Sequence, residues 1–556
     1  MLDDSRCACT SGSLPLRASL GFLLAVALCS ATALPCTTLL VDEEATADGS
    51  TFVTYSCDGG IFAGIRVVPS ATHAPGSSAF LFDDVDFFES TAIAKPEPLG
   101  SIPQIASTYR YLDTLAGPAL WHLGGMNEHG LAIAETTLGG TRPELANPHG
   151  LLAPFSACPE RSLMTLALQR ARTAREAIHV IGELAEMHGY HSTFPMDGEQ
   201  FAISDGLEVW SMEILGPGPD WRPGSGAPGA VWCAQRVPEG HVGVSANRSR
   251  IGEVDLSDTE WFLASPNVKS LAEDMGWWNP QEVFVWSEAY APSNAEQSRI
   301  REWRVFDLVA PSLRLSPEEP LPFSVKPDRL LSAANIMAIQ RDTLEGTVYD
   351  VTAKPAFSAN AELSPLACPM CHGSLYDLLG LEPARTINNR ASSLSCIYQT
   401  SADLAPELRG CTWVGFGPAA TTCYTPIYTG VTELPEKWGS LDVADGDLSL
   451  PFWTMCQPGY LATAQWQNAF PDLQAVRDPA EARFLEERAC LSDRVESWAA
   501  DGDTVATQLN AYTCDRLAAV LAGFEDLAAH LLIEYVIGLG RFSTLPAPAI
   551  ELPDLP

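Results

Sequence analysis

The chain contains 556 residues, of which 46% are hydrophobic and 9% aromatic, a composition typical of a folded protein and not of a disordered one. A single hydrophobic core is unfavourable at this length, so we expect at least two lobes. The formal net charge of −36 would repel nucleic-acid phosphates and anionic lipid, so the composition argues against a nucleic-acid partner.

The start of the chain has the organisation of an export signal. Residues 18–34 form an apolar stretch behind a positive charge, and Ala31-Thr32-Ala33 is an A-x-A cleavage site. A membrane anchor is the alternative, but about 17 apolar residues are short for a span of about 20. We therefore predict that residues 1–35 are a signal peptide (1–33) and a short pro-segment (Leu34-Pro35), and that the protein is secreted or lumenal.

Short apolar segments joined by tight turns dominate the first half of the chain. Residues 36–41 and 50–55 are predicted strands on either side of the turn signal Asp48-Gly49. The same pattern predicts hairpins from three further pairs of segments: 120–125 with 131–137, 200–204 with 207–215, and 230–237 with 241–246. Such hairpins indicate antiparallel sheets and not a βαβ array.

Amphipathic helices lie between these hairpins. Residues 162–172 are rich in Leu, Ala and Arg, and Thr173-Ala174-Arg175-Glu176 matches a capping box that starts a second helix. Apolar residues then recur at helical spacing as far as Gly189, which is a helix stop. Hairpin sheets together with capped helices predict an α+β fold with a layered core.

The second half of the chain contains an insertion, further strands and a helical region. Residues 354–384, which contain Pro, Ala and Cys, are typical of a surface insertion, and strands are predicted between 395 and 429. After a linker, residues 441–544 are predicted to be mainly helical, and acidic residues within their apolar pattern argue against a membrane span. The Pro-rich tail, 545–556, is predicted to be disordered.

Cys36 is the residue on which the functional hypothesis depends. Removal of residues 1–35 would give it a free α-amine, with a pKa of about 7.7–8.0, beside its own thiol, with a pKa of about 8.5. An N-terminal amine can act as the base for its own side chain, so one residue would supply both nucleophile and base. A disulfide is the alternative for a cysteine that follows a signal peptide.

Several sequence blocks, in one order, carry a family resemblance. They include CTTLLV at 36–41, NEHGLAIAETT at 127–137 and ALQRARTAREA at 167–177, and they continue at 209–213, 245–251, 301–304, 345–350 and 425–435. Together they resemble the dipeptidase A (PepD-type) cysteine dipeptidases, which are N-terminal-nucleophile (Ntn) hydrolases related to penicillin V acylase and bile salt hydrolase. The resemblance covers roughly residues 36–480.

The resemblance implies a fold and an activity. The fold would be the four-layer αββα sandwich of Ntn hydrolases, formed by a catalytic domain over residues 36–440. The activity would be hydrolysis of a dipeptide or small amide through a thioester, without a metal and without a cofactor. Two other functions stay open: an amidase or acylase that acts on N-acyl amides, and a non-catalytic secreted binding protein that keeps the fold. A homo-oligomer is also left open.

The resemblance also assigns catalytic roles by position. Cys36 would be the nucleophile, and Asp58 would orient its α-amine and stabilise the protonated form. Asn247 would donate a hydrogen bond to the oxyanion. Arg301 would be the active-site cation, with Arg304 as the alternative, since the two lie one helical turn or one register apart.

Three residues of the block at 127–137 are candidates for substrate binding. Thr137 occupies the position of a second oxyanion contributor in the relatives. Glu135 is an acid that could pair with the substrate's amine, and Asn127 is the third candidate for substrate binding. One departure from the related acylases is clear. Tyr55 stands where they carry an arginine three residues before the aspartate, so the charge balance near the thiol differs here.

Two motifs support other interpretations. Asn247-Arg248-Ser249 is an N-glycosylation sequon, and a glycan there would be incompatible with an oxyanion role, so we predict an unoccupied site. Cys368-Pro369-Met370-Cys371-His372 matches the pattern of c-type haem attachment. A loop disulfide or a small metal clip is the favoured interpretation of this motif, because a lone motif inside a hydrolase-like chain is a weak signal.

Overall fold

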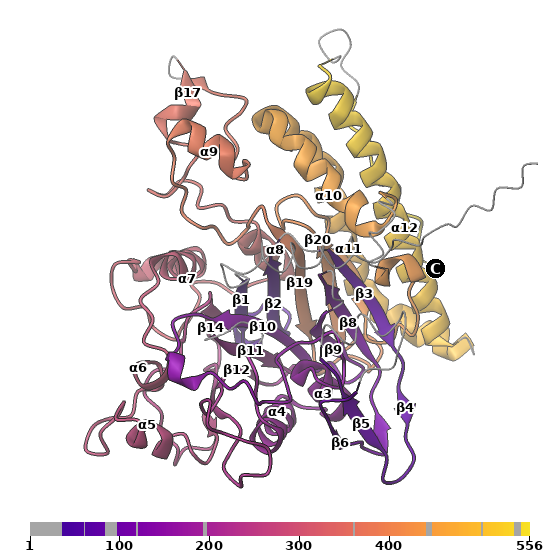
Figure 1. The fold of residues 1–556 in the computed structure, drawn as a ribbon. Helices are drawn as coiled ribbons and strands as arrows, with labels where there is room; N and C mark the ends of the chain where they lie inside the picture. Colours follow the sequence, from indigo (N-terminus) through magenta and orange to yellow (C-terminus); the bar gives the residue numbers. More distant parts are fainter. Residues whose placement is uncertain are drawn as a thin grey trace, which may run out of the picture.

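The computed structural model describes residues 36–59, 62–83, 97–117, 121–192, 197–359, 362–440, 448–501, 504–538 and 546–555. The predicted signal peptide and pro-segment lie outside the described residues. The fold is built from two large antiparallel sheets, helices that pack on them and a helical C-terminal region (Figure 1). The α+β class predicted from the sequence is confirmed.

The first large sheet has seven strands and contains the start of the described chain. Its order is β16 (Ser324–Val325), β14 (Val242–Ser245), β1 (Cys36–Val41), β2 (Thr51–Asp58), β19 (Ser392–Thr400), β20 (Gly410–Phe416) and β21 (Thr425–Tyr428). Every residue of β1 is buried, as its continuous apolar and β-branched sequence predicts. Cys36 therefore begins an interior strand, with β14 on one side and β2 on the other.

The second large sheet has eight antiparallel strands. Its order is β15 (Phe262–Ala264), β13 (Val231–Arg236), β12 (Val209–Leu215), β11 (Gly198–Ser204), β10 (Ala132–Leu138), β9 (Trp121–Asn127), β8 (Tyr111–Ala116) and β3 (Ala63–Val68). The predicted hairpins β9–β10 and β11–β12 are confirmed as neighbouring antiparallel pairs.

The hairpin predicted from residues 230–237 and 241–246 is wrong. β13 belongs to the eight-stranded sheet, whereas β14 belongs to the seven-stranded sheet. The connecting turn is held against the end of β1, because Gly240 N donates to Asp42 Oδ1 (2.7 Å) and Asp42 N donates to His241 O (3.1 Å). This anchoring carries the chain from one sheet to the other, so that β14 pairs with β1 and brings the segment after it toward Cys36.

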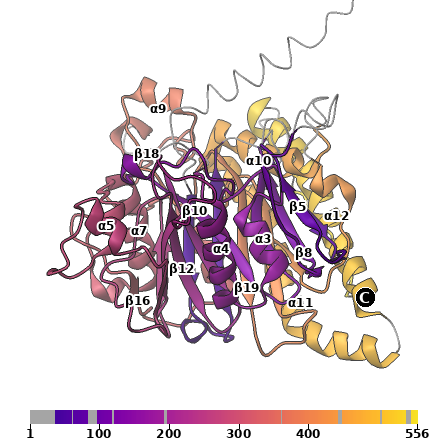
Figure 2. The ribbon, with the colours of Figure 1, turned by 60° about the horizontal axis from the view of Figure 1, so that its bottom comes forward.

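The two large sheets pack face to face. Thr38 Oγ1 on β1 lies 2.7 Å from Thr136 Oγ1 on β10, and it also donates to Glu135 O (3.2 Å). The eight-stranded sheet is covered by α3 (Leu163–Arg170) and α4 (Ala174–His188), which lie in front of it in Figure 2. The seven-stranded sheet contacts α7 (Glu296–Val309) at β14 and α8 (Ala333–Gln340) at β19. The start of β1 thus lies in a layered core.

The predicted N-cap and stop of α4 are confirmed, while only half of the predicted capping box forms, because Glu176 Oε2 accepts from Arg172 N (2.8 Å), one residue before the N-cap. Thr173 Oγ1 accepts a hydrogen bond from Glu176 N (3.2 Å), which satisfies one of the exposed N–H groups at the start of the helix. Gly189 ends the helix with a positive φ of 82°, a conformation that glycine adopts without a Cβ clash.

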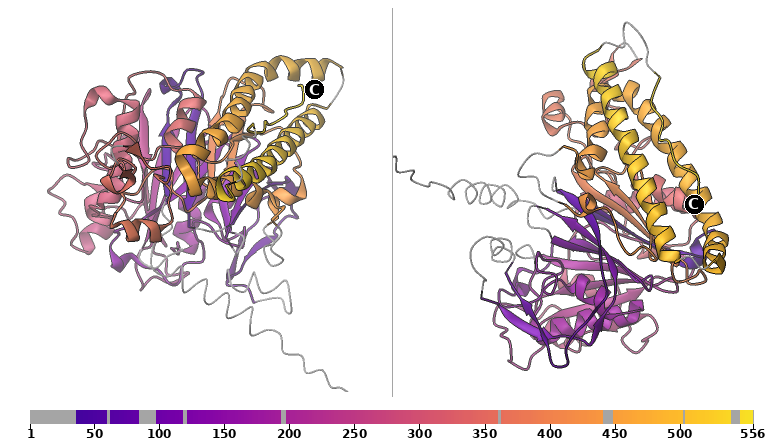
Figure 3. Two further views of the ribbon diagram at one scale, coloured as in Figure 1. Left: turned by 90° about the horizontal axis from the view of Figure 1, so that it is seen from above. Right: turned by 90° about the vertical axis from the view of Figure 1, so that its right-hand side faces the viewer.

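The C-terminal region is helical, as predicted. It consists of α10 (Pro451–Ala462), α11 (Trp466–Asp501) and α12 (Val505–Leu531), which lie together along one side of the molecule in Figure 3. α10 contacts β20 and α12 contacts β21, so this region packs directly on the seven-stranded sheet. The described part of the tail, 546–555, lies against α12: Arg516 Nη2 donates to Pro553 O (3.0 Å), a contact that composition alone did not indicate.

The predicted insertion contains β17 (Ser358–Ala359), β18 (Glu362–Leu363) and α9 (Gly373–Leu379). It packs on α11 through a small apolar cluster that includes Met370, Tyr376, Trp466 and Leu473. The other described elements are β4 (Ala71–Thr72) with β7 (Ser107–Thr108), β5 (Ser78–Leu81) with β6 (Gly100–Pro103), α5 (Ser270–Asp274) and α6 (Trp286–Tyr290). Across the described ranges, no helix is long and apolar enough to cross a membrane.

Candidate active site

Cys36 lies at the first position of β1, fully buried, opposite Cys57 of β2 in the antiparallel pair. Residues that face each other in such a pair point to the same side of the sheet, so the two thiols are neighbours. The Cys36 thiol also lies 3.8 Å from Glu135 Oε1. The hydrogen bond with Cys57, then burial, then the charge of Glu135 raise the pKa of the Cys36 thiol well above its usual value. In this environment the thiol is held in its neutral form.

Arg301 connects the start of β1 to the end of β14. Its guanidinium donates hydrogen bonds to Cys36 O (2.6 Å), Thr37 Oγ1 (2.8 Å), Ala246 O (3.0 Å) and Asn247 Oδ1 (2.9 Å). The side chain comes from α7 and is almost completely buried. Burial, and then the charge of Arg385, lower the pKa of Arg301 to about 9, so it remains a cation at neutral pH.

Asn247 follows β14 and has a φ of 66°, in the left-handed region that asparagine tolerates better than most residues. Arg301 binds its Oδ1 atom, so Nδ2 is the end of the amide that points away from the guanidinium and donates to Thr137 O (2.9 Å). The backbone of the same residue is also fixed, because Gly139 N donates to Asn247 O (3.2 Å). The amide therefore has one defined orientation beside the start of β1.

Asp58 ends β2, one residue beyond the partner of Cys36, and is buried. Arg385 Nη2 (2.8 Å) and Asn389 Nδ2 (3.1 Å) both donate to its Oδ2 atom, and the Ser392 hydroxyl donates to Oδ1. Sequence reasoning missed these partners. Arg385 directly follows the predicted insertion, and no motif marked it; only its contacts in the fold show that it belongs to the site.

Glu135 on β10 contacts the Cys36 thiol, and its Oε1 atom also accepts a hydrogen bond from Tyr55 OH. Tyr55 thus contributes a neutral donor where the related acylases are expected to carry a cation. A second acid, Glu199 on β11, hydrogen-bonds to Glu135. Sequence reasoning missed Glu199 because it precedes the predicted strand by one residue and belongs to no motif.

Glu135 and Glu199 form a buried acid pair. Glu199 lies opposite Thr137 in the β10–β11 ladder, so it is a diagonal neighbour of Glu135 on the same face. Burial raises the pKa of Glu135, while burial and then the charge of Glu135 raise the pKa of Glu199 well above its usual value. The raised pKa values favour one proton held by this pair, because two adjacent buried charges are unfavourable.

Two of the predicted site residues have structural contacts instead. Asn127 Nδ2 donates to Leu168 O (2.9 Å) and Ala171 O (2.8 Å), and its Oδ1 accepts the backbone N–H groups of the β9–β10 turn. The side chain therefore joins this turn to the end of α3. Arg304, the alternative to Arg301, binds Asp342 (2.8 Å) and Asp307 (2.9 Å) and does not contact the start of β1.

Thr137 is brought to the site through its backbone. Its carbonyl oxygen accepts the Asn247 amide, while its buried Oγ1 atom has no hydrogen-bond partner among the described residues. Thr137 and Asn247 are thus neighbours, as their predicted roles require.

The Cys368–His372 motif is a compact turn before α9. The two thiols hydrogen-bond to each other without forming a disulfide, and Cys368 Sγ accepts from Met370 N (3.3 Å). His372 Nδ1 accepts from Ser374 N (3.2 Å), which makes it the N-cap of the helix. In the part of the chain that the structure describes, no group of three or more His, Cys, Asp or Glu side chains is arranged to hold a metal ion.

Comparison with known protein families gives the class of protein. Residues 35–478 match the family described as Peptidase family C69. The chain is therefore a peptide-bond hydrolase. It belongs to peptidase family C69, which fits the resemblance found in the sequence.

Similar curated proteins carry dipeptidase names. Dipeptidase A of Lactobacillus helveticus is 24% identical over 415 residues, which cover 72% of this chain and 77% of the relative. A probable dipeptidase of Salmonella dublin is 25% identical over 412 residues, covering 71% of this chain and 81% of the relative. A probable dipeptidase of Latilactobacillus sakei is 23% identical over 512 residues, which cover 89% of this chain and 96% of the relative.

Proposed function

We propose that the protein is an exported cysteine dipeptidase whose nucleophile is the N-terminal Cys36 of the mature chain. The observation that carries the proposal is the arrangement at the start of β1, where Arg301 binds both Cys36 O and Asn247 Oδ1. The dipeptidase names of the relatives support the substrate class. We further propose that the packed sheets and their covering helices are the four-layer αββα sandwich of Ntn hydrolases.

Maturation is the first step of the proposed mechanism. In the full chain the Cys36 nitrogen is an amide to Pro35 and cannot act as a base. Cleavage of this bond would create an α-amine with a pKa of about 7.7–8.0, which can accept the thiol proton. The resulting ammonium would also stabilise the thiolate, which offsets the effects of Cys57, burial and Glu135 on the thiol. Asp58 lies one residue from the partner of Cys36, where its carboxylate can orient the amine.

Acylation and hydrolysis follow. The Cys36 thiolate attacks the peptide carbonyl, and the Asn247 Nδ2 donor stabilises the oxyanion of the tetrahedral intermediate. The intermediate collapses when the α-ammonium of Cys36 gives its proton to the leaving nitrogen, so an amino acid departs and a thioester remains. A water molecule, deprotonated by the same amine, attacks the thioester and releases the second amino acid.

The acid pair explains how the enzyme would select a free N-terminus. A substrate ammonium that reaches Glu135 and Glu199 stabilises their ionised form, so its binding would expel the shared proton. An N-acylated substrate has no cation for this role and would leave a buried carboxylate uncompensated. This argument favours a dipeptidase over an acylase for the same nucleophile.

Hydrolysis by matched variants tests the proposal. Cys36→Ala should lose hydrolysis of a dipeptide while it remains folded, because the change removes only one buried sulfur atom. Cys490→Ala, a change at an exposed thiol, is the matched control and should keep full activity. The N-acetylated form of the same dipeptide should be a poor substrate. Activity of Cys36→Ala would refute the nucleophile, preference for the acetylated substrate would favour the acylase, and no hydrolysis by the wild type would favour a binding protein.

A further inference from the structure

A cavity of about 350 Å³ lies next to the segment that holds Asp58. Its lining includes Tyr349, Cys371, Tyr376, Arg385, Asn389 and Arg390. Arg385 and Asn389 are the residues that donate to Asp58 Oδ2. The cavity therefore shares two of its wall residues with the candidate active site.

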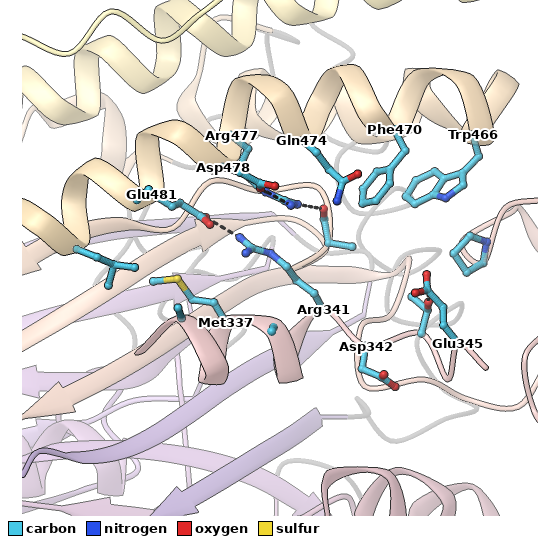
Figure 4. Close-up of a pocket in the computed structure, with 17 residues that line it drawn as sticks. Met337, Arg341, Asp342, Glu345, Trp466, Phe470, Gln474, Arg477, Asp478 and Glu481 are labelled. Atoms are coloured by element: carbon cyan, nitrogen blue, oxygen red, sulfur yellow. Dashed lines mark hydrogen bonds and ion pairs between the residues drawn. The ribbon is translucent and has the colours of Figure 1, made fainter. Parts of the chain in front are cut away.

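The charge of this cavity differs from that of the whole protein. The chain has 69 acidic and 33 basic residues, yet the described residues that line the cavity include two arginines and no Asp or Glu. A larger cavity of about 440 Å³, shown in Figure 4, lies beside α11. Its arginines are neutralised within the wall, where Arg341 pairs with Glu481 (2.5 Å) and Arg477 with Asp478 (2.6 Å). Only the smaller of the two thus presents an excess of positive charge.

The two arginines of the smaller cavity have unused donors. The Nε atoms of Arg385 and Arg390 are buried and have no hydrogen-bond partner among the described residues. Arg385 uses Nη2 for Asp58, while the Arg390 guanidinium lies over the Tyr460 ring at 5.2 Å and has no carboxylate partner in the described chain. A buried N–H donor without an acceptor lowers the stability of the fold. A guanidinium can bind a carboxylate through two parallel hydrogen bonds. An anionic ligand would satisfy both groups.

The cavity is also close to the nucleophile. Asp58 follows Cys57, the cross-strand partner of Cys36. Arg385 N donates to Gln297 Oε1 (2.7 Å), and Gln297 O accepts from Arg301, the side chain that binds Cys36 O. Two independent paths of direct contact, one through β2 and one through α7, therefore join the cavity to the start of β1.

We propose that this cavity is the subsite for the C-terminal residue of the substrate, with Arg390 and Arg385 binding its free carboxylate. The inference rests on the proposed dipeptidase function and names the determinant of substrate length. A longer peptide would place a neutral amide where the carboxylate belongs. Arg385 would keep its pair with Asp58, but Arg390 would be left without an anion. The leaving amino acid occupies this subsite before release.

The test compares a dipeptide with its C-terminal amide. For the wild type, kcat/KM should be roughly 10- to 100-fold higher for the acid than for the amide, the range expected for hydrogen bonds to a charged group. Arg390→Gln should lose most of this preference by lowering kcat/KM for the acid and leaving the amide unchanged. Arg488→Gln, at an arginine that lines a third cavity, is the matched control and should keep the preference. Equal use of acid and amide by the wild type, or an equal loss for both substrates in Arg390→Gln, would overturn the inference.

Binding separates a failure of this inference from a failure of the proposed function. Calorimetry on a Cys36→Ala chain produced without residues 1–35 should give tighter binding of the dipeptide than of its amide. This measurement needs no arginine variant and no turnover. If the wild type hydrolyses no dipeptide, the proposed function fails, and equal binding of acid and amide would then overturn the carboxylate subsite as well. If the wild type hydrolyses the acid and the amide equally, only the subsite fails.

Discussion

Arg301→Lys tests the connection between Cys36 and Asn247. The two Nη atoms of the guanidinium bind four acceptors: Nη1 binds two at the start of β1, and Nη2 binds two in the residues that follow β14. A lysine ammonium is a single point charge and cannot reach both strands in the same way, so at least two of these bonds are lost. At about 1.5–3 kcal/mol for each bond to a charged group, the free energy of unfolding should fall by about 3 kcal/mol or more.

The same change should impair catalysis more than binding. Without Arg301 Nη2, the Asn247 amide loses the contact that fixes its orientation, and the loss of one oxyanion donor typically lowers kcat by about 10²- to 10³-fold. Urea unfolding gives the first quantity and dipeptide hydrolysis at saturating substrate gives the second. Arg304→Lys, one turn along the same helix, is the control and should change kcat little, because its partners are Asp342 and Asp307. Equal kcat values for the two variants would refute the role given to Arg301.

Three further outcomes follow from individual contacts. Burial and the charge of Glu135 raise the pKa of Glu199, so the folded state keeps a proton that the unfolded state releases above a pH of about 4.3, and stability falls as pH rises toward the raised pKa. Glu199→Gln should reduce this decline in urea unfolding between pH 5 and pH 8, leaving only the contribution of Glu135, and a decline parallel to the wild type would contradict the acid pair. Asn127→Ala should lower stability by about 3 kcal/mol, because its amide bonds join a turn to α3, yet leave kcat/KM unchanged; a selective rise in KM would instead restore its substrate role. Asn247 should carry no glycan, so treatment with an N-glycosidase should not alter the mass of the secreted protein, whereas a mass loss would exclude the oxyanion role.

Local signals predicted the fold well where neighbouring segments pair with each other. The N-cap at Thr173, the stop at Gly189 and the hairpin β9–β10 all depend on residues close in the sequence. The segments of β13 and β14 gave the same hairpin signal, but Asp42, almost two hundred positions away, binds the turn between them and directs β14 to the other sheet. Such a long-range contact leaves no local pattern.

The candidate site also contains some residues that the sequence predicted and others that it did not. The resemblance of the sequence blocks named Cys36, Asp58, Asn247 and Arg301, and the fold brings these residues together. It did not indicate Glu199 or Arg385, because an acid at a strand start and an arginine after an insertion have ordinary local sequences. Their roles depend on burial and on partners that only the packed structure supplies.

Export and the oligomeric state stay predictions from the sequence. So does disorder of the tail, 545–556, of which the structure describes 546–555 against α12. Export matters most for the mechanism, because the proposed base exists only after residues 1–35 are removed. The contacts at Cys36 favour neither self-cleavage nor cleavage by a separate protease. Incubation of the purified unprocessed chain distinguishes the two, because only self-cleavage removes residues 1–35 without an added protease.

The most direct test of the account is mass spectrometry of the N-terminal peptide of the active enzyme. One sample is taken before a dipeptide is added, and a second is taken when the reaction with the dipeptide is rapidly quenched during turnover. The account predicts a mature chain that begins at Cys36, and a quenched sample in which this peptide gains the mass of one acyl residue through a thioester on Cys36. Full activity from a chain that still carries Leu34-Pro35, with no acyl group on Cys36 during turnover, would contradict it.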